Sequence, residues 1–221
     1  MSNFFCTNGG CGSCESNCQT PTHPCCPCGD DFHRALELLC CPQLRSLIDF
    51  NAFAFVSGFY VLGAAIQMPP CSTAPGDNLS ELNGRYVCGG DSCETITVSG
   101  LLYPPVAGCS ALKTTVTQAV LCRLIAVAFD AASGSMEDAE ENFQAISQIL
   151  GQLLRPKCQQ ECCTLADALT NAALRSSTVV AGPLVVESST ILGQIGNILV
   201  LANSTDHRFY FICVADIDFI G

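Results

Sequence analysis

The residues of this sequence with the greatest chemical potential are its cysteines. Eighteen of the 221 residues are cysteine, and seven of them lie within the first 28. That first segment has few apolar residues beyond Phe4 and Phe5, so it has almost nothing to bury as a core of its own. Thiols form disulfides and ligate metal ions, and these are the two kinds of chemistry that we expect here.

Two spacings in the segment are compatible with a metal site. The first CxxC pair is Cys11 with Cys14, and the second, ten residues on, is Cys25 with Cys28. Each pair places two sulfur atoms on one ion, which suits tetrahedral zinc, and two histidines are candidate substitute ligands: His23 and His33. Because such a density of cysteine produces CxxC pairs by chance, we favour disulfides and keep zinc as the alternative cofactor.

Adjacent cysteines give a separate indication. The chain has three doublets: Cys25-Cys26, Cys40-Cys41 and Cys162-Cys163. A disulfide needs Cα atoms about 5.5 to 6 Å apart with suitable Cβ directions, so the two members of a doublet more naturally reach two different partners. A doublet is therefore a candidate cross-linking node, although one member of Cys40-Cys41, on an expected helix, is a candidate buried thiol.

The candidate cross-links between subunits lie in the first segment and in a cluster near residue 160. They are Cys6, Cys11, Cys14, Cys18, Cys25, Cys26, Cys28, Cys158, Cys162 and Cys163. By contrast, Cys122 and Cys213 lie in apolar runs, which predicts that they are core thiols.

The sequence offers little support for catalysis. It has three histidines, and it lacks a nucleophile elbow, a glycine-rich phosphate loop, an HExxH motif and paired carboxylates in an apolar setting. We therefore expect no enzyme activity and no catalytic residue. A thiol oxidoreductase, with one cysteine of depressed pKa, is the remaining alternative in that class.

The composition favours assembly with copies of the same chain. A chain of this length that is 49% hydrophobic builds a core without cysteine, so the excess thiols suggest cross-linking between chains. The net charge of −11 and the absence of a basic run argue against nucleic acid or an anionic membrane as partners. Only 13% of residues are charged, which suits a surface covered by neighbouring subunits.

We expect an α+β fold with an antiparallel β-sheet core, a few helices and an extended, cysteine-rich N-terminal arm. The arm covers residues 1–30 and the hydrophobic self-assembly domain residues 31–221. Helices are expected over 32–41, with Asp30 or Asp31 as the cap, and over 136–154, with Ser135 as the cap; Pro42 either ends the first helix or opens a short second one.

Strands are expected in the remaining apolar runs. They are residues 50–66 with a bend at Gly58, a hairpin over 85–98, a strand over 177–186, and a long hairpin of 191–201 with 208–220; residues 113–129 fit either strand or helix. The run from 50 to 66 is too short and interrupted for a membrane span, so we interpret it as buried strand. The N-terminus lacks the basic and apolar regions of a secretory signal, which predicts synthesis in a cytosol.

The whole pattern resembles the cysteine-rich structural proteins of the bacterial spore surface, the exosporium and spore coat proteins of clostridia and bacilli. The segments that carry the resemblance are the thiol-rich arm, CCPQLRSLIDFNAFAFVSGFYVLGA, LCRLIAVAF, the ECC cluster and GQIGNILVLANSTDHRFYFICVADIDFIG. The resemblance implies synthesis in the mother-cell cytosol without a signal peptide, self-assembly into a lattice or filament around the spore, and hardening by disulfides. Its implied partners are copies of the same chain and other spore surface proteins.

Overall fold

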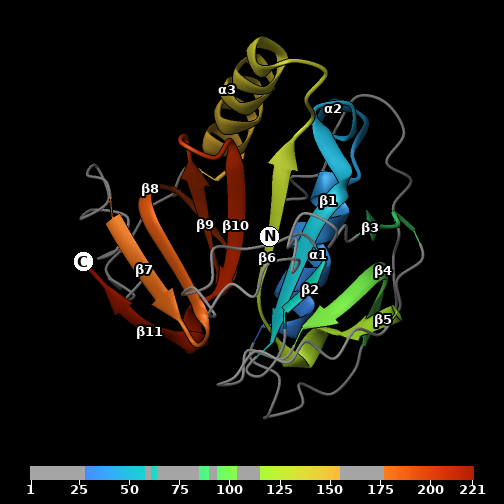
Figure 1. The fold of residues 1–221 in the computed structure, drawn as a ribbon. Helices are drawn as coiled ribbons and strands as arrows, with labels where there is room; N and C mark the ends of the chain where they lie inside the picture. The colour runs from blue at the N-terminus through green and yellow to red at the C-terminus, as the bar shows by residue number, and fades with distance from the viewer. Residues whose placement is uncertain (1–27, 58–60, 64–84, 90–93, 104–114, 155–176) are drawn as a thin grey trace, which may run out of the picture.

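The computed structural model describes residues 28–57, 61–63, 85–89, 94–103, 115–154 and 177–221 (Figure 1). Three α-helices lie in these ranges: α1 (Gly29–Leu39), α2 (Pro42–Arg45) and α3 (Met136–Leu153). Two short 3-10 turns, η2 (Leu121–Arg123) and η3 (Val214–Asp216), each precede a strand.

Eleven strands form one sheet. The strands are β1 (Ile48–Ser57), β2 (Val61–Gly63), β3 (Arg85–Tyr86), β4 (Thr95–Tyr103), β5 (Thr115–Val120), β6 (Leu124–Ala131), β7 (Ser177–Ala181), β8 (Leu184–Ile195), β9 (Ile198–Asn203), β10 (Arg208–Cys213) and β11 (Ile217–Ile220). Their order is β11-β7-β8-β9-β10-β6-β1-β2-β4-β3, with β5 also paired to β4, and every pairing is antiparallel. The expected α+β fold with an antiparallel core is therefore confirmed.

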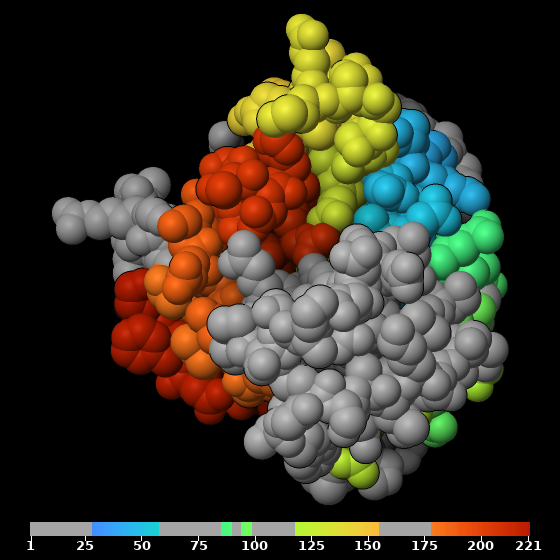
Figure 2. Space-filling view, viewed as in Figure 1, coloured from blue at the N-terminus to red at the C-terminus, as the bar shows by residue number. Residues whose placement is uncertain are grey.

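Alternating side chains of the central strands divide the core between the two faces of the sheet. On β10, Phe209 and Phe211 point to the face that α1 and α3 cover, whereas Tyr210 and Ile212 point to the other face. There the strands β7, β8 and β11 fold over the centre of the sheet and bury its second face. The central strands are thus buried on both faces, which explains why their sequences are continuous apolar runs. On the side shown in Figure 2, α3 (yellow), the C-terminal strands (red and orange) and the start of β1 (blue) form adjoining surfaces.

A row of aromatic rings runs across the helix-covered face. Phe129 of β6 lies at its centre, with ring centroids 5.4 Å from Phe53, 5.3 Å from Phe209 and 5.4 Å from Phe211. Phe143 of α3 continues the row, 4.9 Å from Phe209. These contacts join β1, β6, β10 and α3, which are far apart in the sequence, into one packed layer.

Several local expectations are confirmed. Ser135 caps α3 by accepting a hydrogen bond from the amide of Asp138, and Pro42 opens α2. The run at 50–66 forms the antiparallel pair β1 and β2, and β3 pairs with β4 as the expected hairpin. The ambiguous run at 113–129 is strand on both sides of η2.

Three local expectations are wrong. The N-cap of α1 is Cys28 and neither Asp30 nor Asp31, because both aspartates already lie within the first helical turn. The last long hairpin is divided, because a turn at Gly196 separates β8 from β9, and β11 leaves β10 at η3 to pair with β7. The first helix also begins earlier than expected, because α1 starts at Gly29 instead of Phe32.

None of the helices in the described part of the chain combines the length and the apolar character that crossing a bilayer requires.

We expect Phe129→Ala to lower the free energy of unfolding by about 3 to 5 kcal/mol, because it opens a cavity at the centre of the aromatic row. Denaturant-induced unfolding of the purified protein measures this change. The control is Met136→Ala, at a side chain that is 87% exposed, which should change stability by less than about 0.5 kcal/mol. Equal effects of the two substitutions would contradict the central place of Phe129.

Candidate functional site

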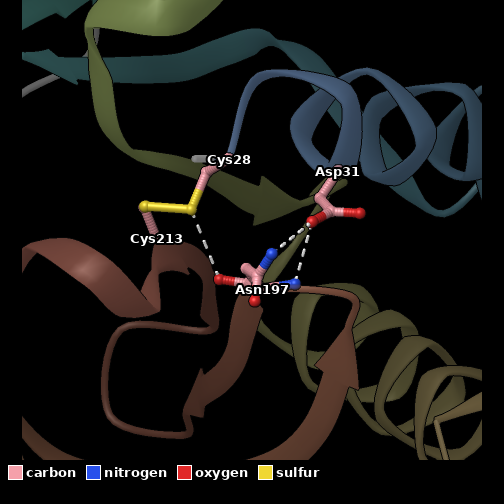
Figure 3. The surroundings of a disulfide bond; sticks show 4 residues. All are labelled: Cys28, Asp31, Asn197 and Cys213. Atoms are coloured by element: carbon pink, nitrogen blue, oxygen red, sulfur yellow. Dashed lines mark hydrogen bonds between the residues drawn. A yellow bond between two sulfur atoms is a disulfide. The ribbon is translucent and has the colours of Figure 1, made fainter. Parts of the chain in front are cut away.

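The chemistry of the described residues concentrates where the chain enters α1. Cys28 forms a disulfide with Cys213 at the end of β10, with Cα atoms 5.7 Å apart and 185 residues of sequence between them (Figure 3). Both cysteines are almost completely buried, at 3% and 1% exposure. The bond therefore fixes the start of α1 to the end of β10.

The turn between β8 and β9 reinforces this attachment. Asp31, in the first turn of α1, accepts two hydrogen bonds from Asn197 through Oδ2, from the backbone amide at 3.0 Å and from the side-chain amide at 3.1 Å. The Asn197 carbonyl oxygen accepts a hydrogen bond from the amide of Val214 at 2.8 Å, and the Cys28 sulfur lies 3.5 Å from the same oxygen. Helix α1, the β8–β9 turn and the end of β10 are thus held together by one disulfide and a small polar network (Figure 3).

This close approach explains the glycine in the turn. Gly196 has a φ of +56°, and a Cβ atom there would collide with the carboxylate of Asp31. In addition, a two-residue hairpin loop whose first residue is glycine has a backbone twist that matches the twist of the flanking strands. The Gly-Asn dipeptide between two apolar runs is the sequence signal that would have predicted this turn.

A second disulfide fastens the other end of α1. Cys40, just after the helix, bonds Cys88 beside β3, with Cα atoms 5.8 Å apart. Its neighbour Cys41 is a buried thiol whose sulfur lies 4.0 Å from the carbonyl oxygen of Glu37. The Cys40-Cys41 doublet thus has one bonded cysteine and one buried thiol, which was the alternative considered for it.

The two disulfides close long loops, which is where cross-links stabilise most. Separations of 185 and 48 residues give loop-closure contributions of about 5 and about 4 kcal/mol in the chain-entropy model. Both act on α1, so the helix is fixed to the sheet at each end.

The expectation that Cys122 and Cys213 are core thiols is wrong. Both are disulfide-bonded, and Cys213 lies at the end of its apolar strand, where it reaches Cys28 at the N-cap of α1. Cys28 was among the cross-link candidates between subunits, but here it is bonded within its own chain. The remaining candidates lie outside the described residues: Cys6, Cys11, Cys14, Cys18, Cys25, Cys26, Cys158, Cys162 and Cys163.

The disulfide also changes the zinc alternative. A thiolate is the form of cysteine that ligates zinc, so Cys28 in its bonded form cannot be the fourth ligand beside Cys11, Cys14 and Cys25. The substitute ligand His33 lies on α1 with its Nδ1 3.7 Å from a carboxylate oxygen of Glu37. Within the described residues, no three His, Cys, Asp or Glu side chains are grouped to hold a metal ion.

Two polar clusters that lie away from the Cys28–Cys213 disulfide join elements of the fold to one another. Arg208 donates from Nη2 to Asp130 at 2.7 Å and also pairs with it through Nε, which joins β10 to β6. Burial opposes the charge of Arg208, but the hydrogen bonds and charge of Asp130 outweigh it, so the pKa of Arg208 lies above its ordinary value. Tyr210 lies on the same face of β10 as Arg208, and burial raises its pKa to about 12.

The second cluster links α3 to the β9–β10 turn. His207 Nε2 lies 2.7 Å from a carboxylate oxygen of Glu140, and its ring packs against Phe143 with centroids 5.6 Å apart. Hydrogen bonds from Gln144 and then His207 lower the pKa of Glu140. No nucleophile stands beside the histidine in these contacts.

An open cleft of about 580 Å³ lies between the start of β1 and the start of α3. Its carboxylates are Asp49, Asp138 and Glu141, and its lining includes neither cysteine nor histidine.

The fold and the Cys28–Cys213 bond define a disulfide-bonded α+β protein in which the start of α1 is joined covalently to a large antiparallel sheet. The chain belongs to the spore coat protein CotA-like family, whose sequence profile matches residues 25–221. It is 30% identical to spore coat protein CotA of Clostridioides difficile (strain 630) over 257 aligned positions, which cover 89% of this chain and 83% of the relative. No solved structure matches the chain. The resemblance to spore surface proteins is therefore confirmed.

We expect the double variant Cys28→Ser/Cys213→Ser to lose about 2 to 5 kcal/mol of stability, because the unfolded chain regains the entropy of a long loop. Replacing both cysteines leaves no new thiol to mispair. Denaturant-induced unfolding without reductant measures the loss, and the difference from the wild type should vanish when both proteins are fully reduced. Asp31→Ala, which removes the hydrogen bonds to Asn197 and the exposed ion pair with Arg34, should cost about 1 kcal/mol. A double variant as stable as the wild type would contradict the bond between Cys28 and Cys213.

Tyr210 should make the fold sensitive to alkaline pH. Its pKa in the folded protein is about 12, whereas the unfolded chain releases this proton near 10.0. The stabilisation is complete below pH 10 and is lost as the pH rises from 10 to 12, by up to about 3 kcal/mol. Tyr210→Phe should show a smaller decline between pH 8 and pH 11 in denaturant unfolding of thiol-alkylated protein. Parallel declines in the two proteins would contradict this role of Tyr210.

Proposed function

We propose that this protein is a non-enzymatic structural component of the spore surface, in the exosporium or coat, that self-assembles into a disulfide-cross-linked lattice or filament. The spore-surface part rests on membership of the spore coat protein CotA-like family. The cross-linking part rests on the cysteine distribution and on the anchored base of the N-terminal segment.

The observation that carries the proposal is the Cys28–Cys213 disulfide. It attaches the base of a segment with six further cysteines to the end of β10. A bond formed by that segment to another subunit is then connected covalently to the centre of the sheet. Force on the cross-link would pass into β10 and its paired neighbours instead of unravelling the chain from its end.

Docking of subunits would favour the bonds between them. Once two copies touch, their thiols meet at a high effective concentration, and disulfides form in preference to random pairs. The same logic extends to other cysteine-rich proteins of the spore surface as partners.

The recombinant full-length protein should form large species that survive boiling in detergent and that dissolve when reductant is added. A variant with serine at the six cysteines that precede Cys28 should run mainly as a monomer on gels without reductant. The matched variant, with serine at Cys158, Cys162 and Cys163, measures how much the second cysteine cluster contributes to cross-linking between subunits. Electron microscopy and non-reducing gels are the readouts, with bound zinc measured in parallel. A wild-type protein that is monomeric without reductant and carries stoichiometric zinc would overturn the proposal in favour of a metal-binding module.

A further inference from the structure

Within the described ranges, the edge strands β11 and β5 each pair with another strand on one side only. At one end β11 pairs only with β7, and at the other end β5 pairs with β4. Strand β4 is flanked by β5 on one side and by β2 and β3 on the other. Val98 and Ser99 of β4 pair with β3, and the adjoining residues Thr97 and Gly100 pair with β5. Within the described ranges, no strand covers the outer side of β5 or of β11. Figure 1 places the two strands on opposite sides of the molecule.

Hydrogen bonds show which backbone groups point outward from β11. The amide of Gly221 donates to Thr178 at 3.0 Å, and its carbonyl accepts from Thr178 at 2.6 Å, so Gly221 faces β7. Because alternate residues of an antiparallel strand face opposite partners, the N–H and C=O of Ile220 point away from β7. They are available to a further strand.

The same reasoning applies to β5. The amide of Leu121 donates to the Glu94 carbonyl of the β4 side at 2.9 Å, in the register that pairs Ala119 with Ile96. The backbone groups of Gln118 and Val120 therefore point outward. The strand, TVTQAV, contains no charge and no proline, which are the usual protections of a free edge.

Exposed apolar side chains accompany both edges. Phe219 on β11 is 57% exposed and Val120 on β5 is 48% exposed, and both belong to the small group of exposed large hydrophobic residues in the described part of the chain. In Figure 2 the red surface of the C-terminal strands lies at the lower left of the coloured part, and the green and yellow-green surface of β3 to β5 lies at the right and lower right.

Strand direction and charge indicate what these edges bind. Along the path from β11 to β5 every neighbouring pair is antiparallel and the number of strands is even, so the two terminal strands run in opposite directions. A second copy in the same orientation therefore offers β11 antiparallel to β5, and the alternation continues across the junction. In that pairing the end of β5 lies beside the start of β11, which brings the exposed Arg123 toward Asp216 and Asp218.

We infer that a second copy of this chain pairs its β11 with β5, so that subunits add to one another edge to edge as a continuous antiparallel sheet. This contact is heterologous, and it produces an open chain of subunits rather than a closed dimer. The inference rests on the proposed function and names the contact that would align subunits before their thiols bond.

Two variants remove one edge each. Ile220→Pro deletes an outward N–H of β11, and Gln118→Pro deletes an outward N–H of β5; neither N–H belongs to the internal ladder, and proline is tolerated at such positions of edge strands. Phe219→Lys and Val120→Lys are the second pair of variants, in case a proline impairs folding. Met136→Lys, which places the same charge on an exposed apolar residue of α3, is the control.

The proteins are alkylated on their accessible thiols, so that only non-covalent contacts form, and are examined by analytical ultracentrifugation. We expect wild type and the α3 control to form a series of oligomers, and each edge variant alone to remain a monomer. An equimolar mixture of a β11 variant with a β5 variant should yield a dimer and nothing larger, because one intact β11 meets one intact β5. Circular dichroism confirms that each variant is folded.

Other results overturn the inference. Edge variants that form the same oligomers as wild type would exclude β11–β5 pairing, and dimers of one edge variant alone would indicate pairing of like edges. The proposed function is read separately, on protein that has not been alkylated, from detergent-resistant species that dissolve in reductant. Such species with unaffected edge variants would leave the proposed function standing and exclude the edge contact.

Discussion

The disulfide between Cys28 and Cys213 is the constraint on which the arrangement of this protein depends. It joins the beginning of α1 to the end of a central strand across 185 residues. Without it α1 would be held by apolar packing, by the second disulfide at Cys40 and by the hydrogen bonds of Asp31 to Asn197. With it the start of α1 has a fixed position on the sheet, and under the proposed function this would anchor the cysteines that precede Cys28.

The sequence predicted the class of fold well and its long-range pairings poorly. The cap at Ser135, the prolines and the apolar runs are local signals, and the elements that depend on them formed as expected. The partner of β11 and the bond of Cys213 depend on which strands become neighbours in the folded chain, and no local pattern contains that information. Cys213 in particular follows an apolar strand that looks the same whether its thiol is buried or bonded. The divided hairpin was missed for a different reason, since the Gly-Asn signal at Gly196 was present but lay inside a run that was otherwise continuous.

The cysteines with known partners and the candidate cross-linking cysteines have different proposed roles. The two disulfides with both partners in the described residues, Cys28–Cys213 and Cys40–Cys88, attach α1 to the sheet. The cross-linking cysteines proposed for contacts between subunits lie before Cys28 and near residue 160. Edge pairing of β11 with β5 would align neighbouring subunits without covalent bonds, and the thiols would then fix the alignment. The low charge of the chain and its few protective residues on β5 suit a protein whose edges are covered after assembly.

The most direct test of the central claim is to determine which disulfides join different chains. Protein made with ¹⁴N and protein made with ¹⁵N are mixed as reduced monomers, assembled by oxidation and digested with pepsin at acid pH, where disulfides do not exchange. Mass spectrometry then separates disulfide-linked peptides of one label from those of both. The account predicts mixed labels for peptides with the cysteines that precede Cys28, and single labels for Cys28–Cys213 and Cys40–Cys88. Single labels in every disulfide-linked peptide would contradict cross-linking between subunits.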